Sequence, residues 1–162
     1  MNTKLLKQIV LDESISAEKK IDIINLLINE QPKESTCSID STRSVDIFGT
    51  VIWTNKVGLY HRIDGPTVEY VDGSKEWWLN GKLHRTDGPA VEHFNGDKFW
   101  YLNDVRHRTD GPAVEFPSGD KFWYLNDVRH RTDGPAIEFA SGTKHWYLNG
   151  KGLTEDQFNN SL

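Results

Sequence analysis

Histidine, arginine and aspartate recur together in this chain, in a His-Arg-x-Asp-Gly-Pro block that begins at His61, His84, His107 and His130. Imidazole and carboxylate groups can bind a metal or transfer protons, and arginine can bind phosphate or carboxylate. The blocks are 23 residues apart each time. A set of groups repeated at a fixed period lacks the asymmetry of a single catalytic constellation, so the sequence predicts a protein that is not an enzyme.

Distance argues against a metal site in the column of block histidines. If each repeat is one β-hairpin, equivalent residues lie about 10 Å apart along the array. Two histidine nitrogens bound to one zinc lie at most about 4 Å apart, so the sequence predicts no metal and no cofactor. The blocks are instead interpreted as turns, in which each aspartate caps its own loop and each arginine pairs with a glutamate of the following Ala-Val-Glu strand.

Short strands must position these blocks. Asn95-Gly96 is typical of a two-residue type I′ hairpin turn, which predicts Val91 opposite Trp100 and Glu92 opposite Phe99. Strand alternation then places valine and tryptophan on a core face, and glutamate, phenylalanine and tyrosine on the other face. Further turns are predicted at pairs of the Asn-Gly and Asn-Asp type: Asn80-Gly81, Asn103-Asp104, Asn126-Asp127 and Asn149-Gly150.

The predicted second face carries a column of aromatic residues. Tyrosine, tryptophan, arginine and histidine are common in protein interfaces, and an uncovered patch of this size exceeds what a monomer usually exposes. The candidate binding residues are Trp78, Phe99, Tyr101, Phe122, Tyr124, Tyr147, His84, Arg85, His107, Arg108, His130 and Arg131. Three occupants of this face stay open: the N-terminal helices, a second copy of the chain, and a partner or ligand.

The chain divides into four predicted segments. Residues 1–31 form an amphipathic helical hairpin, and the hydroxyl-rich residues 32–46 form a linker. Residues 47–152 form the β-hairpin repeat array, with a degenerate first unit followed by four fuller units. Thr154 and Gln157 make a capping-box pattern, so residues 153–162 are predicted to contain a short terminal helix. The predicted fold class is mainly β, an array of stacked antiparallel β-hairpins with helical ends.

The repeats resemble those of the MORN family. The resemblance is carried by the 23-residue period, by an aromatic strand followed by Asn-Gly-Lys-x-His at Trp78 to His84, and by Asp-Gly turns such as Asp72-Gly73. It covers residues 48–152. In this chain arginine replaces the family's glycine after the histidine, one extra residue precedes the next glycine, and proline follows it. The resemblance implies stacked hairpins that form an open, groove-like sheet, and a role in scaffolding or partner binding.

Charge and composition argue against two classes of partner, nucleic acids and membranes. The chain carries 19 Lys and Arg against 24 Asp and Glu, a net charge of −5, which argues against a nucleic-acid partner. The single cysteine, Cys37, and the absence of a signal-peptide pattern or a long apolar run predict a cytoplasmic protein without membrane association. The predicted function is a non-enzymatic binding or scaffold protein that engages a protein partner or itself.

An alternative function follows from a second resemblance. Repeats of the His-Arg-x-Asp-Gly-Pro type are similar to sequences of bacteriophages and large viruses. This implies a counter-defence protein that sequesters a nucleotide-like small molecule or inhibits a host protein. Aromatic rings beside arginine and histidine donors suit the stacking and hydrogen bonding of a nucleotide.

Overall fold

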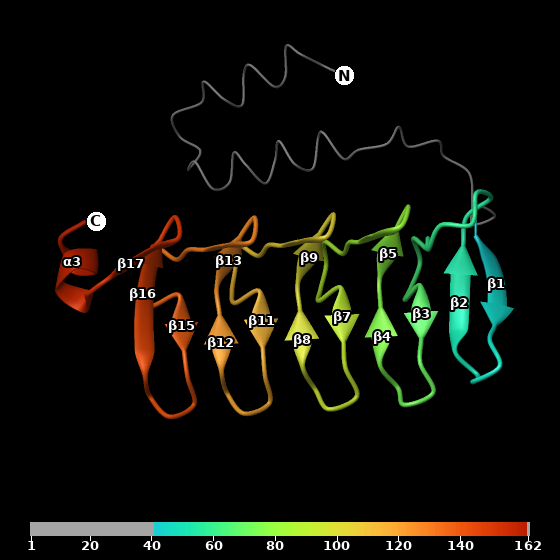
Figure 1. The fold of residues 1–162 in the computed structure, drawn as a ribbon, viewed down its shortest axis with the longest axis horizontal. Helices are drawn as coiled ribbons and strands as arrows, with labels where there is room; N and C mark the ends of the chain where they lie inside the picture. Colours follow the sequence, from blue (N-terminus) through green and yellow to red (C-terminus); the bar gives the residue numbers. More distant parts are fainter. Residues whose placement is uncertain (1–40, 162) are drawn as a thin grey trace, which may run out of the picture. The chain divides into compact units, whose positions relative to one another are not determined.

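The computed structural model describes residues 41–161, which form a row of antiparallel β-hairpins (Figure 1). One eleven-stranded sheet runs through the row in the order β1-β2-β3-β4-β7-β8-β11-β12-β15-β16-β17. Three separate two-stranded sheets, β5–β6, β9–β10 and β13–β14, alternate with its hairpins along the chain. The prediction of a mainly β array of antiparallel hairpins is therefore confirmed.

The strands are short, and most contain two residues. Those of the long sheet are β1 (Thr42–Val45), β2 (Val51–Thr54), β3 (Val68–Glu69), β4 (Lys75–Glu76), β7 (Val91–Glu92), β8 (Lys98–Phe99), β11 (Val114–Glu115), β12 (Lys121–Phe122), β15 (Ile137–Glu138), β16 (Lys144–Leu148) and β17 (Lys151–Leu153). Those of the short hairpins are β5 (Trp78–Leu79), β6 (Lys82–Leu83), β9 (Tyr101–Leu102), β10 (Val105–Arg106), β13 (Tyr124–Leu125) and β14 (Val128–Arg129).

The array begins earlier than the sequence predicted. Residues 42–45 belong to the predicted linker, but they form β1, which pairs antiparallel with β2. The carboxylate of Asp46 accepts hydrogen bonds from the N–H groups of Phe48 and Thr50, both at 2.9 Å, and so fixes the turn between the two strands. The linker prediction is thus wrong for these residues. The predicted helical hairpin of residues 1–31 and residues 32–40 of the predicted linker lie outside the described residues.

The tip of each long hairpin is a three-residue loop. In the second full repeat the N–H of His93 donates to the carbonyl of Asp97 at 2.9 Å, and the N–H of Gly96 donates to the carbonyl of His93 at 2.8 Å. Gly96 has a φ of 92°, as expected for a type I turn followed by a left-handed glycine. Val91 therefore pairs with Phe99, and the predicted pairing with Trp100 is wrong by one residue.

Because of this one-residue shift, the side chains of the second strand in each long hairpin lie on the opposite face of the sheet from the one predicted. Phe99 joins Val91 on one face, called here the aromatic face, and Lys98 lies opposite Glu92 on the other, called the charged face. The same register recurs in the neighbouring repeats, where Val114 pairs with Phe122 and Ile137 with His145. The charged face carries alternating glutamate and lysine across the sheet: Glu69, Lys75, Glu92, Lys98, Glu115, Lys121, Glu138 and Lys144.

Rings packed edge to face cover the centre of the aromatic face. Phe99, Phe116, Phe122 and Phe139 follow one another with ring centroids 5.7 to 5.9 Å apart and ring planes nearly perpendicular. This geometry is favourable for aromatic pairs. The aliphatic residues at the equivalent position of each repeat are 2–7% exposed: Val68, Val91, Val114 and Ile137. These buried aliphatic residues thus form a strip along the long sheet.

The short hairpins turn through two residues in the left-handed region. Asn103 and Asp104 have φ values of 54° and 68°, which is the type I′ geometry, and the predicted turn there is confirmed. The N–H of Asp104 donates to the carbonyl of Leu83 at 2.9 Å, and its carboxylate accepts the N–H of Leu83 at 2.8 Å. These bonds reach the preceding short hairpin, so the turns hold neighbouring repeats together.

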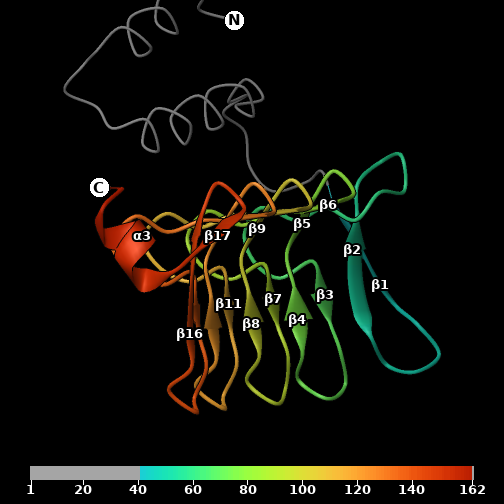
Figure 2. The same ribbon diagram turned by 60° about the vertical axis from the view of Figure 1, so that its left-hand side comes forward.

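The chain turns a corner between each long hairpin and the short hairpin that follows it (Figure 2). A tryptophan stands between the two strands at this corner, as Trp100 does between β8 and β9. The N–H of Trp100 donates to the carbonyl of Ala113 in the next repeat at 2.9 Å, whereas its carbonyl accepts the N–H of His107 in its own repeat at 3.2 Å. The strand thus leaves the long sheet at this residue. Trp77 and Trp123 occupy the same place one repeat before and one repeat after.

The C-terminal end of the array is closed by the helix α3 (Glu155–Asn159). Thr154 and Gln157 form the predicted capping box, and Phe158, 3% exposed, is buried where α3 packs against β16 and β17. The short terminal helix is therefore confirmed. Within residues 41–161 no helix has the length and apolar character needed to cross a bilayer.

Candidate functional site

Arginine is the central residue of each His-Arg-x-Asp-Gly-Pro block. In the third block Nε of Arg108 donates to Asp110 Oδ1 at 2.8 Å. Its Nη1 donates to the carbonyl of Pro112 at 3.1 Å and to Glu115 Oε1 at 3.0 Å. The guanidinium carbon lies 4.1 Å from the ring centroid of Trp100, close enough for a cation–π interaction. We call this set of contacts the arginine clamp.

The clamp is the same in all four blocks. The distances from the guanidinium carbon to the tryptophan centroid are 4.0 to 4.1 Å, and the arginine side chains are 18–21% exposed. A Cβ atom on Gly111 would lie 2.8 Å from Cζ of Arg108, so the loop needs glycine for the guanidinium to approach its backbone. The four arginines are Arg62, Arg85, Arg108 and Arg131, and they stack on Trp53, Trp77, Trp100 and Trp123.

Two interpretations of the block can now be compared with its geometry. The predicted pairing of arginine with the glutamate of the following strand is confirmed, for example between Arg131 and Glu138 at 2.8 Å. The prediction that aspartate mainly caps its own turn is corrected. Its principal partner is the arginine two residues earlier, and the hydrogen bond within the loop backbone contributes less to its pKa.

The arginine clamps make the free energy of unfolding of the array depend on pH. The arginine holds the pKa of the partner aspartate below its usual range, mainly through the Nε hydrogen bond, in all four blocks. A carboxyl group of this kind stabilises the fold above its unfolded pKa of about 3.9, and the contribution is lost as the pH falls through the folded value. We expect the free energy of unfolding, measured by denaturant titration, to fall progressively below about pH 4.

Asp110→Asn provides the matched variant for this pH dependence. It should be less stable than the unmodified chain at neutral pH, because an amide does not carry the charge that the guanidinium binds. The difference should shrink as the pH falls, because protonation removes the same charge from the unmodified chain. A difference that stays constant down to the acid transition would contradict the assignment.

The block histidines bind the turn of the next repeat. Nδ1 of His130 accepts the N–H of Asn149 at 3.0 Å, and Nδ1 of His84 lies 2.9 Å from Oδ1 of Asn103. His61 and His107 make the same link to the asparagine 19 residues later. Burial lowers the pKa of His84. The imidazoles thus join neighbouring repeats through their Nδ1 atoms.

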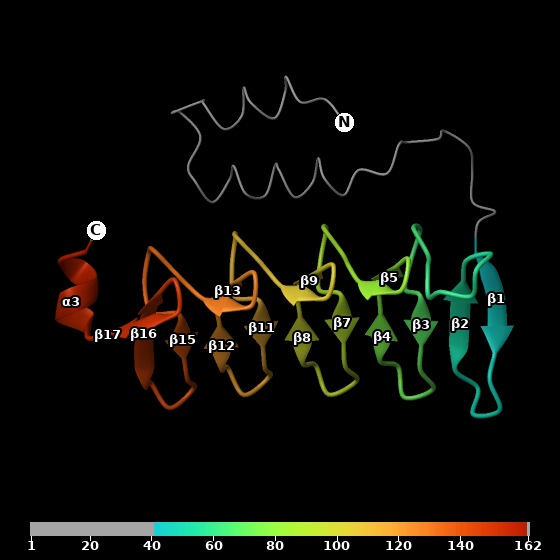
Figure 3. The same ribbon diagram turned by 45° about the horizontal axis from the view of Figure 1, so that its top comes forward.

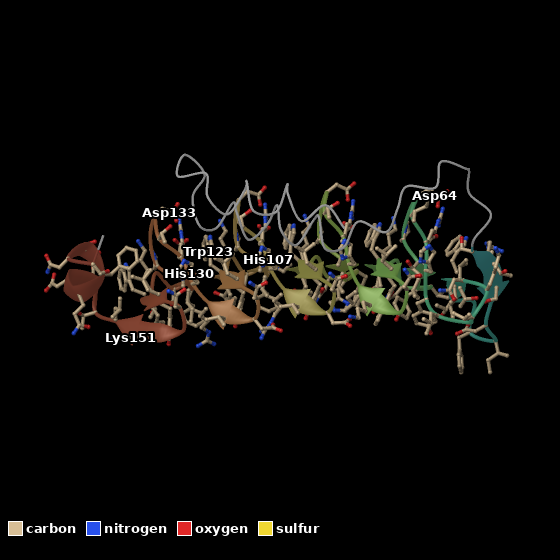
Figure 4. The ribbon with its side chains drawn as sticks, turned by 90° about the horizontal axis from the view of Figure 1, so that it is seen from above. Asp64, His107, Trp123, His130, Asp133 and Lys151 are labelled. Atoms are coloured by element: carbon tan, nitrogen blue, oxygen red, sulfur yellow. The ribbon has the colours of Figure 1, made fainter. Side chains whose placement is uncertain are left out.

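The blocks lie along one side of the array. Figure 3 shows one loop per repeat on this side, and Asp64 and Asp133 mark two of them opposite Lys151 in Figure 4. Among residues 41–161, no group of three or more histidine, cysteine, aspartate or glutamate side chains could hold a metal ion. The side chains that could do chemistry are therefore brought together within each repeat, as arginine clamps, and not into one shared centre.

The predicted aromatic column is largely engaged in packing. None of the twelve candidate binding residues is exposed. Tyr124 and His107 are 7% and 5% exposed, and the other ten are half-buried. Arg106 lies 4.1 Å from the ring centroid of Tyr124, and Trp78 donates from Nε1 to Glu76 at 2.7 Å. Phe99 and Phe122 share a face with Val91 and Val114, which had been predicted to lie on the opposite side.

The exposed apolar residues lie instead at the hairpin tips. The first residue of each three-residue tip loop is exposed, and the equivalent residue of the β1–β2 turn is also exposed. Ile47, Val71 and Phe94 are 93%, 72% and 71% exposed. We call this set the tip row: Ile47, Val71, Phe94, Pro117 and Ala140. The 23-residue spacing from Val71 to Ala140 is visible in the sequence, but the predicted two-residue turn places these residues in strands.

The comparisons with known proteins leave the family open. No family model matches this chain, and no curated protein matches it. The likeness to MORN repeats therefore rests on the repeat pattern and stays a prediction.

Proposed function

We propose that this chain is a non-enzymatic binding or scaffold protein whose tip row docks a protein partner. The observation that carries the proposal is the exposure of Ile47, Val71 and Phe94, each above 70%, at equivalent places in successive hairpins. Adjacent hairpins place such residues about 10 Å apart along a single line. Single exposed apolar residues scattered over a surface are normal in a monomer. A row of them at equivalent positions is instead typical of an interaction surface.

The arginine clamps support a protein partner over a nucleotide-like ligand. A nucleotide base would stack on tryptophan and arginine, but the guanidinium of Arg85 already lies 4.0 Å from the ring centroid of Trp77. Its Nε and Nη1 atoms donate to Asp87, Glu92 and the carbonyl of Pro89. A base stacked there would have to displace these internal contacts. The tip row offers apolar area without that cost, which suits side chains of a protein.

The double variant Val71→Ser and Phe94→Ser tests the proposal. Both side chains are mostly solvated, so the free energy of unfolding should change by less than about 1 kcal/mol. Capture of the partner should fall by about tenfold or more if these residues are central to the interface. The measurement is affinity capture from the native host, with captured proteins quantified by mass spectrometry.

A matched control uses exposed residues on the block side of the array. The double variant Thr86→Ala and Thr109→Ala changes two exposed side chains of the block loops and leaves the tip row intact. It should retain full capture. If the same proteins are captured equally by the tip-row variant and by the unmodified chain, the tip row is not the binding surface.

A further inference from the structure

The two ends of the long sheet differ in what lies next to their last strand. At the C-terminal end α3 packs against β16 and β17. At the other end β1 is the last strand, and within the described residues it has a neighbouring strand on one side only, β2 (Figure 1). All four residues of β1 are exposed. An edge strand of this kind presents unpaired backbone groups that can pair with another chain.

The register of β1 identifies which backbone groups face outward. The N–H of Asp46 donates to the carbonyl of Thr50 at 3.0 Å. Residues of an antiparallel strand alternate between facing their partner and facing away, so Ser44 also bonds toward β2. The N–H and C=O groups of Arg43 and Val45 therefore point to the open edge. Two residues with outward-facing groups make a short self-complementary segment.

Exposed apolar area is concentrated at the same end. Within residues 41–161, nine of the eleven exposed large hydrophobic residues lie between Val45 and Val71. Three of them, Val45, Ile47 and Phe48, belong to β1 or to the turn that follows it, at 51%, 93% and 77% exposed. A surface so biased toward one end of a regular array is typical of an end that is covered in an assembly.

We propose that β1 pairs antiparallel with β1 of a second copy of this chain, about a two-fold axis through Ser44. The strand that pairs, β1, contains no residue of the tip row, and the pairing goes beyond the proposed function. A closed two-fold dimer fits better than a head-to-tail chain of copies, because α3 occupies the end that β1 of the next copy would have to meet.

Only one symmetric register lets both Arg43 and Val45 form backbone hydrogen bonds with the second copy without an unfavourable contact. With Ser44 opposite Ser44, each Arg43 pairs with the Val45 of the other copy, and four backbone hydrogen bonds form. A register centred on Arg43 would place like charges directly opposite, which is unfavourable. A register centred on Val45 would require Ile47, which lies in the turn after β1. The guanidinium of Arg43 lies over its own Trp53, 5.9 Å from the ring centroid, and so stays on its own sheet.

The solution mass of the full chain is the first measurement. Sedimentation analysis should give twice 18.6 kDa, falling to 18.6 kDa in Val45→Pro, since proline removes an outward N–H without breaking the bonds to β2. Val71→Pro is the matched control, because the equivalent tip residue of a later repeat is Pro117. It should remain a dimer. A monomer up to the hundred-micromolar range in the unmodified chain would overturn the proposal.

A disulfide tests the register directly. In a Cys37→Ser background, Ser44→Cys places two thiols in a non-hydrogen-bonded pair with Cα atoms about 4.5 Å apart, within disulfide range. It should cross-link fully under mild oxidation. Thr42→Cys puts the two Cα atoms about 14 Å apart and should not cross-link. A dimer that resists Val45→Pro and does not cross-link through position 44 uses another surface. The tip-row variant should leave the mass unchanged, so the two proposals fail separately.

Discussion

Arg108→Ala is expected to lower the free energy of unfolding by roughly 3 kcal/mol. The substitution removes the donor for Asp110, for the carbonyl of Pro112 and for Glu115, and it removes the cation that lies 4.1 Å from the ring centroid of Trp100. The glutamate is then left half-buried without its cation. Denaturant titration followed by tryptophan fluorescence measures the loss and also reports the changed environment of the indole.

Two comparisons separate the geometry of the clamp from its charge. Arg108→Lys keeps the charge but cannot reproduce the planar fork that reaches three acceptors and stacks on the ring, so we expect it to recover less than half of the loss. Lys151→Ala removes an exposed cation and should change stability by no more than about 0.5 kcal/mol. An Arg108→Lys variant as stable as the unmodified chain would show that charge alone matters.

Tyr124→Ala is expected to cost roughly 3 to 5 kcal/mol, the range for truncating a large buried ring. Tyr124 is 7% exposed and belongs to the core cluster with Ala113 and Val114. Arg106 covers its ring at 4.1 Å. The same substitution one repeat earlier, Tyr101→Ala, should cost at least about 1 kcal/mol less, because Tyr101 is more exposed.

The contrast between the two tyrosines has a cause in the sequence. The residue that precedes Arg106 by one repeat is Leu83, so the short hairpin before Tyr101 supplies no guanidinium to cover the ring. Tyr124→Phe keeps the ring and loses only the hydroxyl, which lies 3.4 Å from Nε of Arg129, so its cost should stay below about 1 kcal/mol. Equal losses for Tyr101→Ala and Tyr124→Ala would contradict the role assigned to Arg106.

Much of the fold could be predicted from local patterns. The 23-residue period predicted the number and order of the hairpins. The asparagine turns and the capping box at Thr154 could also be predicted, because each depends only on residues close together in the chain. The register of the long hairpins could not be derived from the Asn-Gly and Asp-Gly pairs alone. Such pairs suit a two-residue type I′ turn and equally the last two residues of a three-residue loop, since both need glycine at positive φ.

Two further residues would have decided the register. Pro117 stands where a two-residue turn would place a strand residue, whereas it is favourable as the first residue of a type I turn. Glu115 and Lys121 face each other only with the longer loop, and opposite charges across a strand pair are favourable. The arginine clamp depends on this register, because only then do tryptophan and glutamate share a face, so its stacking could not be predicted.

The identity of residues 97–113 and 120–136 bears on how such a chain can change in length. Each copy meets its neighbours through the same bonds, for example from His107 to Asn126 and from His130 to Asn149. A duplicated 23-residue stretch inserted after Ala113 would therefore find complementary surfaces on both sides. It would lengthen the row by about 10 Å and leave β1 and α3 intact. The length of the array can therefore increase or decrease in fixed steps, by duplication or loss of one 23-residue repeat.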